Sequence, residues 1–183
     1  MQSQRMSFLI LHGIEGSGPE HWQTWVAGRL RERGLVVSYP ELPEADAPRL
    51  ERWLAALDDE LGRLPAAETT VLCHSLGCLL WLHHDGPDVA RALLVAPPQP
   101  DVEVAGAVGF RPVPLRRSAA RETRFVCSTD DPWCTPEASR RMAEAVGAPV
   151  DWVEGGGHIN TDAGFGPWPA LEAWCMGDAE RPV

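Results

Sequence analysis

Short apolar runs alternate along this chain with stretches whose apolar residues recur at the helical period. Each run has five or six residues and is apolar almost throughout, which is typical of strands buried on both faces of a parallel sheet. The predicted strands are residues 7–11, 35–40, 69–73, 91–96, 123–128 and 150–154.

Amphipathic helices are predicted between most of these runs. Asp46 is suited to be the N-cap of one helix, and Thr135, Pro136 and Gly147 mark the start and end of another. Strands and helices in alternation predict an α/β fold, a three-layer α/β/α sandwich with a mostly parallel sheet of about six strands. The predicted helices are residues 19–33, 46–62, 76 onward, 135–147 and 169–176.

Residues 97–122 interrupt this alternation. The segment holds five prolines and no periodic pattern, and it is too small to be a separate domain, so we expect it to wall a site. Without a linker, repeat or low-complexity tract, residues 1–183 are expected to form a single domain around one core.

Composition narrows the possible partners. The net charge is −10, and no basic tract is longer than Arg116-Arg117, which argues against nucleic acid or an anionic membrane surface as a partner. The longest apolar run near the N-terminus, residues 8–11, is too short for a signal peptide core or a membrane span. We therefore expect a cytoplasmic protein.

Cysteine and lysine usage restricts the chemistry. The five cysteines form no CxxC pair, so neither a disulfide framework nor a common zinc site is expected, and we predict no metal and no cofactor. All sixteen basic side chains are arginine, which excludes a Schiff-base lysine, a P-loop lysine and a Ser-Lys dyad.

Ser75 is the candidate nucleophile. It follows the predicted strand 69–73, in the pattern Cys73-His-Ser75-Leu-Gly77, which is close to the nucleophile elbow G-x-S-x-G. Small residues are needed two positions either side of the serine because the turn is sharp. Cys73 stands where glycine is usual but is small enough to fit. The alternative is an ordinary serine N-cap.

A nucleophilic serine needs a base and an orienting acid, which in the elbow fold follow in the order Ser, acid, His. His158 comes after the last predicted strand, behind three glycines that allow a tight bend. Asp130 and Asp131 compete as the acid. Asp131 is favoured because Pro132 restricts it to an extended conformation, and Asp130 is then a turn residue.

An oxyanion hole needs two backbone N–H groups. Leu76, at the helix N-terminus, is one expected donor. Ile14 in the glycine-rich loop after the first strand is the second, with Glu15 the next choice. Trp133 and Trp168 lie in loops near the proposed acid and base, and each either lines an acyl pocket or packs in the core.

These motifs resemble those of the small serine hydrolases of the retinoblastoma-binding-protein and YdeN type, in the α/β-hydrolase superfamily. The resemblance covers nearly the whole chain. It implies an α/β-hydrolase fold without a cap domain, with Ser75 as nucleophile, Asp131 as acid and His158 as base. The eukaryotic members' L-x-C-x-E motif is absent, so no protein partner is inferred. The matching stretches are "LHGIEGSGPEHWQTW", "VLCHSLGCLL", "RPVPLRRSAARETRFVCSTDDPWCTPEASRRMAEAVGA" and "EGGGHINTDAGFGPWP".

The expected function is carboxylesterase-like hydrolysis of a small-molecule acyl ester through an acyl-enzyme on Ser75. Two alternatives stay open. One is a non-catalytic binding module with the same fold, and the other is a thioesterase or acyltransferase that uses the same side chains.

Overall fold

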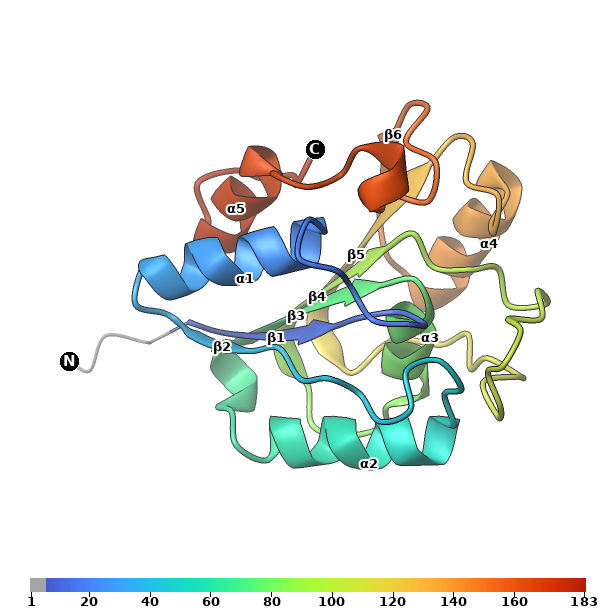
Figure 1. Ribbon diagram of the computed structural model, residues 1–183, viewed down its shortest axis with the longest axis horizontal. Helices are drawn as coiled ribbons and strands as arrows, with labels where there is room; N and C mark the ends of the chain where they lie inside the picture. The colour runs from blue at the N-terminus through green and yellow to red at the C-terminus, as the bar shows by residue number, and fades with distance from the viewer. Residues whose placement is uncertain (1–5) are drawn as a thin grey trace.

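A computed structural model describes residues 6–183. All of its strands belong to one six-stranded parallel sheet in the order β2-β1-β3-β4-β5-β6 (Figure 1). The sheet agrees with the predicted α/β fold, and the strands lie within a few residues of the predicted runs. They are β1 (Ser7–Leu11), β2 (Val36–Ser38), β3 (Thr69–His74), β4 (Val89–Val95), β5 (Ala120–Ser128) and β6 (Val150–Val153).

Within residues 6–183, five helices cover the two faces of the sheet and complete the three layers (Figure 1). The apolar sides of α1 and α5 pack on one face, and those of α2, α3 and α4 pack on the other. The helices are α1 (Trp22–Glu32), α2 (Leu50–Leu61), α3 (Leu76–His83), α4 (Pro136–Val146) and α5 (Pro169–Met176), with short 3-10 turns η1 (Ala66–Glu68) and η2 (Thr161–Ala163).

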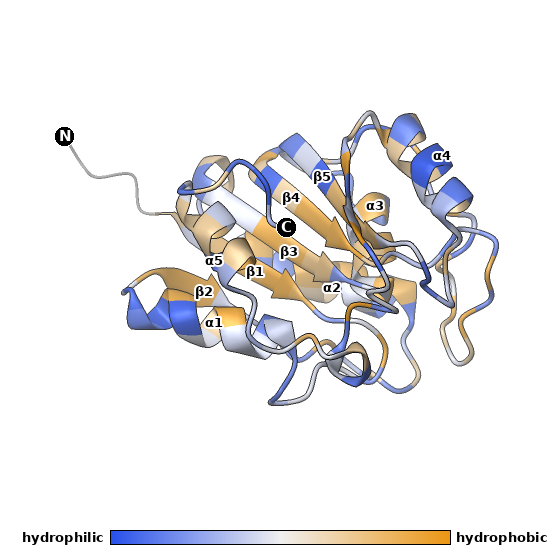
Figure 2. Ribbon diagram, turned by 90° about the horizontal axis from the view of Figure 1, so that it is seen from above, coloured by the Kyte–Doolittle hydropathy of each residue, from blue (hydrophilic) through white to orange (hydrophobic). Residues whose placement is uncertain are grey.

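The core lies between these layers. Every residue of β1 and β3 is buried, in accord with their apolar runs, and the central strands stand out as hydrophobic in Figure 2. Trp22, Trp53 and Trp81 are fully buried, so each contributes a large apolar surface to one of the two helix–sheet interfaces.

Two helices begin later than predicted. The second helix starts at Leu50 with Arg49 as its N-cap, so the expectation that Asp46 caps it is wrong. Pro48 explains the difference, because a residue that precedes proline is disfavoured in helical conformation. The first helix starts at Trp22, where His21 Nδ1 accepts a hydrogen bond from the Gln23 N–H. By contrast, α4 has the predicted Thr135 cap and left-handed Gly147.

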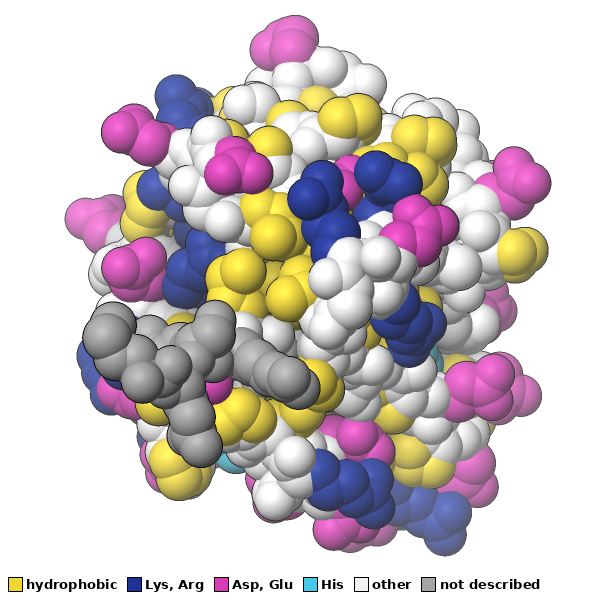
Figure 3. Space-filling model, turned by 90° about the vertical axis from the view of Figure 1, so that its left-hand side faces the viewer, with side chains coloured by type: hydrophobic (Ala, Val, Ile, Leu, Met, Phe, Trp, Pro, Cys, Tyr) yellow, Lys and Arg dark blue, Asp and Glu magenta, His cyan; other side chains and the backbone are white. Residues whose placement is uncertain are grey.

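The strand order reverses between β1 and β3, which places a crevice at the carboxyl ends of these two strands. No helix connects β4 to β5, and residues 96–119 instead run over the same end of the molecule (Figure 1). Figure 3 faces the opposite end, where acidic and basic side chains are interspersed among apolar ones.

Candidate active site

Ser75 stands at a tight turn between β3 and α3. Its φ of 52° and ψ of −124° lie in a region that residues other than glycine rarely adopt, and its N–H donates to Val95 O over 3.0 Å. A Cβ added at Gly77 would lie 2.5 Å from Leu11 O, and one added at Gly13 would lie 2.9 Å from Ser75 Cβ. This crowding is the physical reason for the small residues around the serine.

His158 joins Ser75 to Asp131. Its Nε2 lies 2.8 Å from Ser75 Oγ, and its Nδ1 lies 3.0 Å from both Asp131 carboxylate oxygens. The Asp131 side chain is 3% exposed and that of His158 is 13% exposed, so water screens their interaction weakly. A hydroxyl, an imidazole and a carboxylate linked in this order are able to pass a proton from the hydroxyl to the imidazole.

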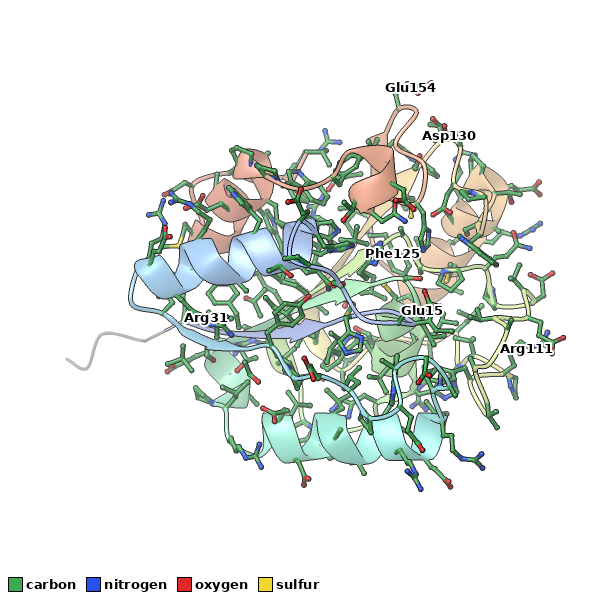
Figure 4. All side chains as sticks on the ribbon, in the orientation of Figure 1. Glu15, Arg31, Arg111, Phe125, Asp130 and Glu154 are labelled. Atoms are coloured by element: carbon green, nitrogen blue, oxygen red, sulfur yellow. The ribbon has the colours of Figure 1, made fainter. Side chains whose placement is uncertain are left out.

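The two adjacent aspartates do different things. Asp131 accepts the Trp133 N–H at 2.9 Å in addition to its contact with His158. Asp130 accepts the Ser128 hydroxyl and the Gly157 N–H, both at 2.7 Å, and these bonds hold its pKa below the usual range. The structure therefore brings Asp131 to the His158 imidazole. Asp130 instead binds the backbone of the loop that carries His158. Asp130 and Glu154 lie in neighbouring loops (Figure 4).

Two further histidines surround His158, and sequence reasoning did not assign either to the site. His74 Nε2 donates to the backbone O of His158 over 2.9 Å, and its ring packs against those of His158 and His21 at centroid distances of 5.1 and 4.7 Å. Burial lowers the pKa of His74 well below its ordinary value and that of His21 to about 4. Both rings are uncharged near neutral pH. For His74, its position directly before Ser75 was the sequence signal that could have placed it at the site.

The candidate oxyanion donors differ in availability. Leu76 is the first residue of α3, and neither its N–H nor that of Ile14 donates to an acceptor within residues 6–183. The Glu15 N–H already donates to Ala45 O over 2.6 Å, so it is committed elsewhere. Of the two loop residues weighed, Ile14 is the one with a free donor.

A pocket of about 520 Å³ opens above Ser75 and His158. The loop after β1, with Ile14 and Glu15, forms one side (Glu15 is labelled in Figure 4), and Trp133, 44% exposed, lies on its lining. Trp168 instead packs edge-on against Trp22 and is 7% exposed, which makes it a core residue. The other side of the pocket is Pro98, Val104 and Ala105, from the segment between β4 and β5.

No helix within residues 6–183 is both long and apolar enough to cross a lipid bilayer. In that same part of the chain, no group of three or more His, Cys, Asp or Glu side chains is arranged to hold a metal ion. All five cysteines are unpaired and buried, and burial raises the pKa of the Cys73 thiol in the core beneath the turn.

The sequence matches the family described as serine hydrolase over residues 8–175. It is 29% identical over 173 residues to YdeN of Bacillus subtilis (strain 168), covering 88% of this chain and 90% of YdeN. The crystal structure of the ydeN gene product from B. subtilis matches with a TM-score of 0.76 and 23% identity, over 94% of this chain and 98% of the other. A YdeN-like protein from Pectobacterium atrosepticum gives a TM-score of 0.74 and 24% identity, over 94% and 92% of the two chains.

Proposed function

The chain belongs to the serine hydrolase family, and from this membership and the site geometry we propose that it is a carboxylesterase that cleaves small acyl esters through an acyl-enzyme on Ser75. In this proposal Ser75, His158 and Asp131 form a catalytic triad. The observation that carries the proposal is the 2.8 Å contact between Ser75 Oγ and His158 Nε2 at a strained turn.

Acylation begins when Ser75 Oγ attacks the ester carbonyl carbon while His158 Nε2 takes the hydroxyl proton. Asp131, which accepts a hydrogen bond from the Nδ1–H group, holds the productive tautomer and stabilises the imidazolium. The free N–H groups of Leu76 and Ile14 donate to the oxyanion of the tetrahedral intermediate. The intermediate collapses when the C–O bond to the alcohol breaks and His158 gives that alcohol its proton.

Deacylation repeats these steps with water. His158 removes a proton from water as the oxygen attacks the acyl carbon, and the bond between that carbon and Ser75 Oγ then breaks. The proton returns to Ser75, and a carboxylic acid leaves. The open pocket supports water as the acceptor, because its walls leave the acyl carbon accessible to solvent.

A non-catalytic binding module is the competing proposal for the same fold. Against it stands the strained backbone of Ser75, because strain of about 1–3 kcal/mol persists only where the surrounding structure enforces it and is concentrated at functional sites. The buried Asp131 carboxylate argues in the same direction, since a buried acid beside an imidazole is costly unless it is paired. Five unpaired cysteines support the cytoplasm as the place of action.

The test is hydrolysis of p-nitrophenyl acetate by the wild-type protein and by Ser75→Ala. We expect the substitution to lower kcat by about 10⁴-fold or more, since it removes the nucleophile. Ser38→Ala, on the edge strand β2, is the matched control and should retain full activity. A fluorophosphonate probe should label the wild-type protein at Ser75. A folded protein that neither hydrolyses esters nor takes the label would be a binding module.

A further inference from the structure

A second cavity lies beside the nucleophile, beneath the segment that joins β4 to β5. Its volume is about 240 Å³. Two of its lining residues, Leu76 and Leu79, are buried on α3, and the others come from the overlying segment. Arg111 lies at its lining too, with its guanidinium bonded to Asp101 O, and Figure 4 shows Arg111 at the outer side of the molecule. The apolar side chains of the lining are those of Leu76, Leu79, Val102, Val104, Ala107, Val108 and Phe110.

This cavity adjoins the active-site pocket. Val104 lines both, and Leu76, which follows the nucleophile directly in the chain, lines the smaller one. Val104 is thus a shared wall, so an acyl group held on Ser75 Oγ would enter the smaller cavity where the Val104 side chain turns aside, and would otherwise extend toward solvent. The route past Val104 removes the hydrocarbon from water, which favours it for any chain long enough to enter.

We propose that the cavity bounded by Val104, Ala107 and Phe110 is an acyl-chain subsite, and that the preferred substrates are esters of unbranched acids of roughly six carbons. The size follows from the volume, because a methylene group fills about as much space as a water molecule, about 30 Å³, so that the whole cavity would hold about eight such groups. Its outer part opens to solvent beside the exposed Val108, so only the groups in the inner part are removed from water, which sets the preferred length below that limit. This subsite rests on the proposed esterase function.

The side chains of the lining also favour an alkyl occupant. They are apolar except that of Arg111, whose guanidinium is bonded to Asp101 O, so an alkyl chain gains favourable burial for each methylene that leaves water. The loop after β1, with Glu15, and the exposed Trp133 lie on the larger pocket instead, so the alcohol part of the ester is assigned to that side.

The kinetic test compares p-nitrophenyl acetate, butyrate, hexanoate and octanoate. For the wild-type protein we expect kcat/KM to rise about threefold to fourfold per added methylene up to hexanoate and then to level off. Ala107→Phe, which fills the cavity, should lower the ratio of kcat/KM for hexanoate to kcat/KM for acetate most of the way to one. Leu115→Phe, in the same segment but lining neither cavity, is the matched control and should keep that ratio. Val102→Phe repeats the test if Ala107→Phe does not fold.

A binding test separates this proposal from the esterase function. Calorimetry with Ser75→Ala should find hexanamide, a neutral acyl analogue, bound at least tenfold more tightly than acetamide, and Ala107→Phe added to that protein should remove the difference. Equal binding of the two amides, or a hexanoate preference that survives filling of the cavity, would overturn the subsite. Failure of every ester in the wild-type protein would overturn the esterase function, and the amide result would still decide the subsite.

Discussion

The two walls of the active-site pocket are built in opposite ways. One wall consists of strand ends and short loops that carry Ser75, Asp131 and His158, and closely spaced hydrogen bonds hold it, such as Ser75 N to Val95 O and Gly157 N to Asp130. The other is the irregular segment between β4 and β5. It is held at separate points, where Gln99 N donates to Trp133 O and Val108 exchanges two bonds with the start of α2.

In the proposed esterase, this difference separates the groups that react with the ester from those that select it. Groups that must keep contacts of 2.8 to 3.0 Å are fixed by the sheet, so their positions are determined by the most stable part of the fold. Side chains that only line a substrate path sit on the segment with fewer constraints. Substitutions in the first wall should therefore change kcat, and substitutions in the second should change KM and chain-length preference.

The largest expected effect concerns the acid. Asp131→Asn keeps the shape of the side chain but cannot hold His158 in the productive tautomer, so we expect kcat for p-nitrophenyl acetate to fall about 10⁴-fold. Asp130→Asn still offers an oxygen to Ser128 and Gly157 and should stay within about tenfold of wild type. Steady-state kinetics of both variants decide the matter. Equal losses would mean that the two aspartates share the role.

The next largest effect is a fall in the free energy of unfolding at acidic pH. The folded protein lowers the pKa of His21 from 6.5 to about 4, chiefly by burial, so between these values the unfolded chain binds a proton that the folded chain does not. Unfolding therefore becomes easier as the pH falls from 6.5 to 4, by up to about 3 kcal/mol for this residue. The free energy of unfolding, measured in urea at pH 7 and at pH 5, tests this prediction.

His21→Asn is the control for this acid sensitivity, because asparagine keeps a cap for the N-terminus of α1 but does not titrate. The variant should lose less stability than the wild-type protein between the two pH values. An unchanged loss would show that the first wall does not depend on keeping His21 uncharged.

A smaller effect is expected at His74, a positioning residue that holds the backbone of His158. His74→Phe removes the donor to His158 O and should lower kcat about 10- to 100-fold with little change in KM. His74→Gln supplies a donor at a similar place and should recover most of the activity. If His74→Phe is more active than His74→Gln, His74 acts through packing alone. The pH profile of kcat provides a second readout.

The smallest effect is expected in the second wall. The Gln99 side chain accepts the Thr135 N–H at 3.3 Å and donates to Asp101, both at exposed positions. Gln99→Ala should leave kcat within about twofold, change the KM for p-nitrophenyl hexanoate by roughly threefold, and alter the free energy of unfolding by less than about 1 kcal/mol. A tenfold fall in kcat would show that this segment takes part in the chemistry, and would break the contrast between the walls.

Predictability from the sequence follows the same division. Strands, helices and the position of Ser75 are encoded in local periodicity and turn residues, so they were predicted with errors of a few residues at the ends. The role of His74 and the crowding of Gly77 against Leu11 arise from contacts between segments far apart in the chain, which no local pattern records. Asp130 and Asp131 are neighbours with the same side chain, and only the direction in which each points distinguishes them.

The attachment of Val108 to the start of α2 carries an evolutionary consequence. Its N–H donates to Pro48 O and its carbonyl accepts from Leu50 N, so the chain between Gln99 and Val108 is a span tethered at both ends over the pocket mouth. Extra residues inserted within that span would leave every strand in register, since the tethers keep both ends in place and the added residues would loop out between them. A larger lid could grow from this spot in descendants of the chain, altering what enters the site while the reacting groups stay where they are.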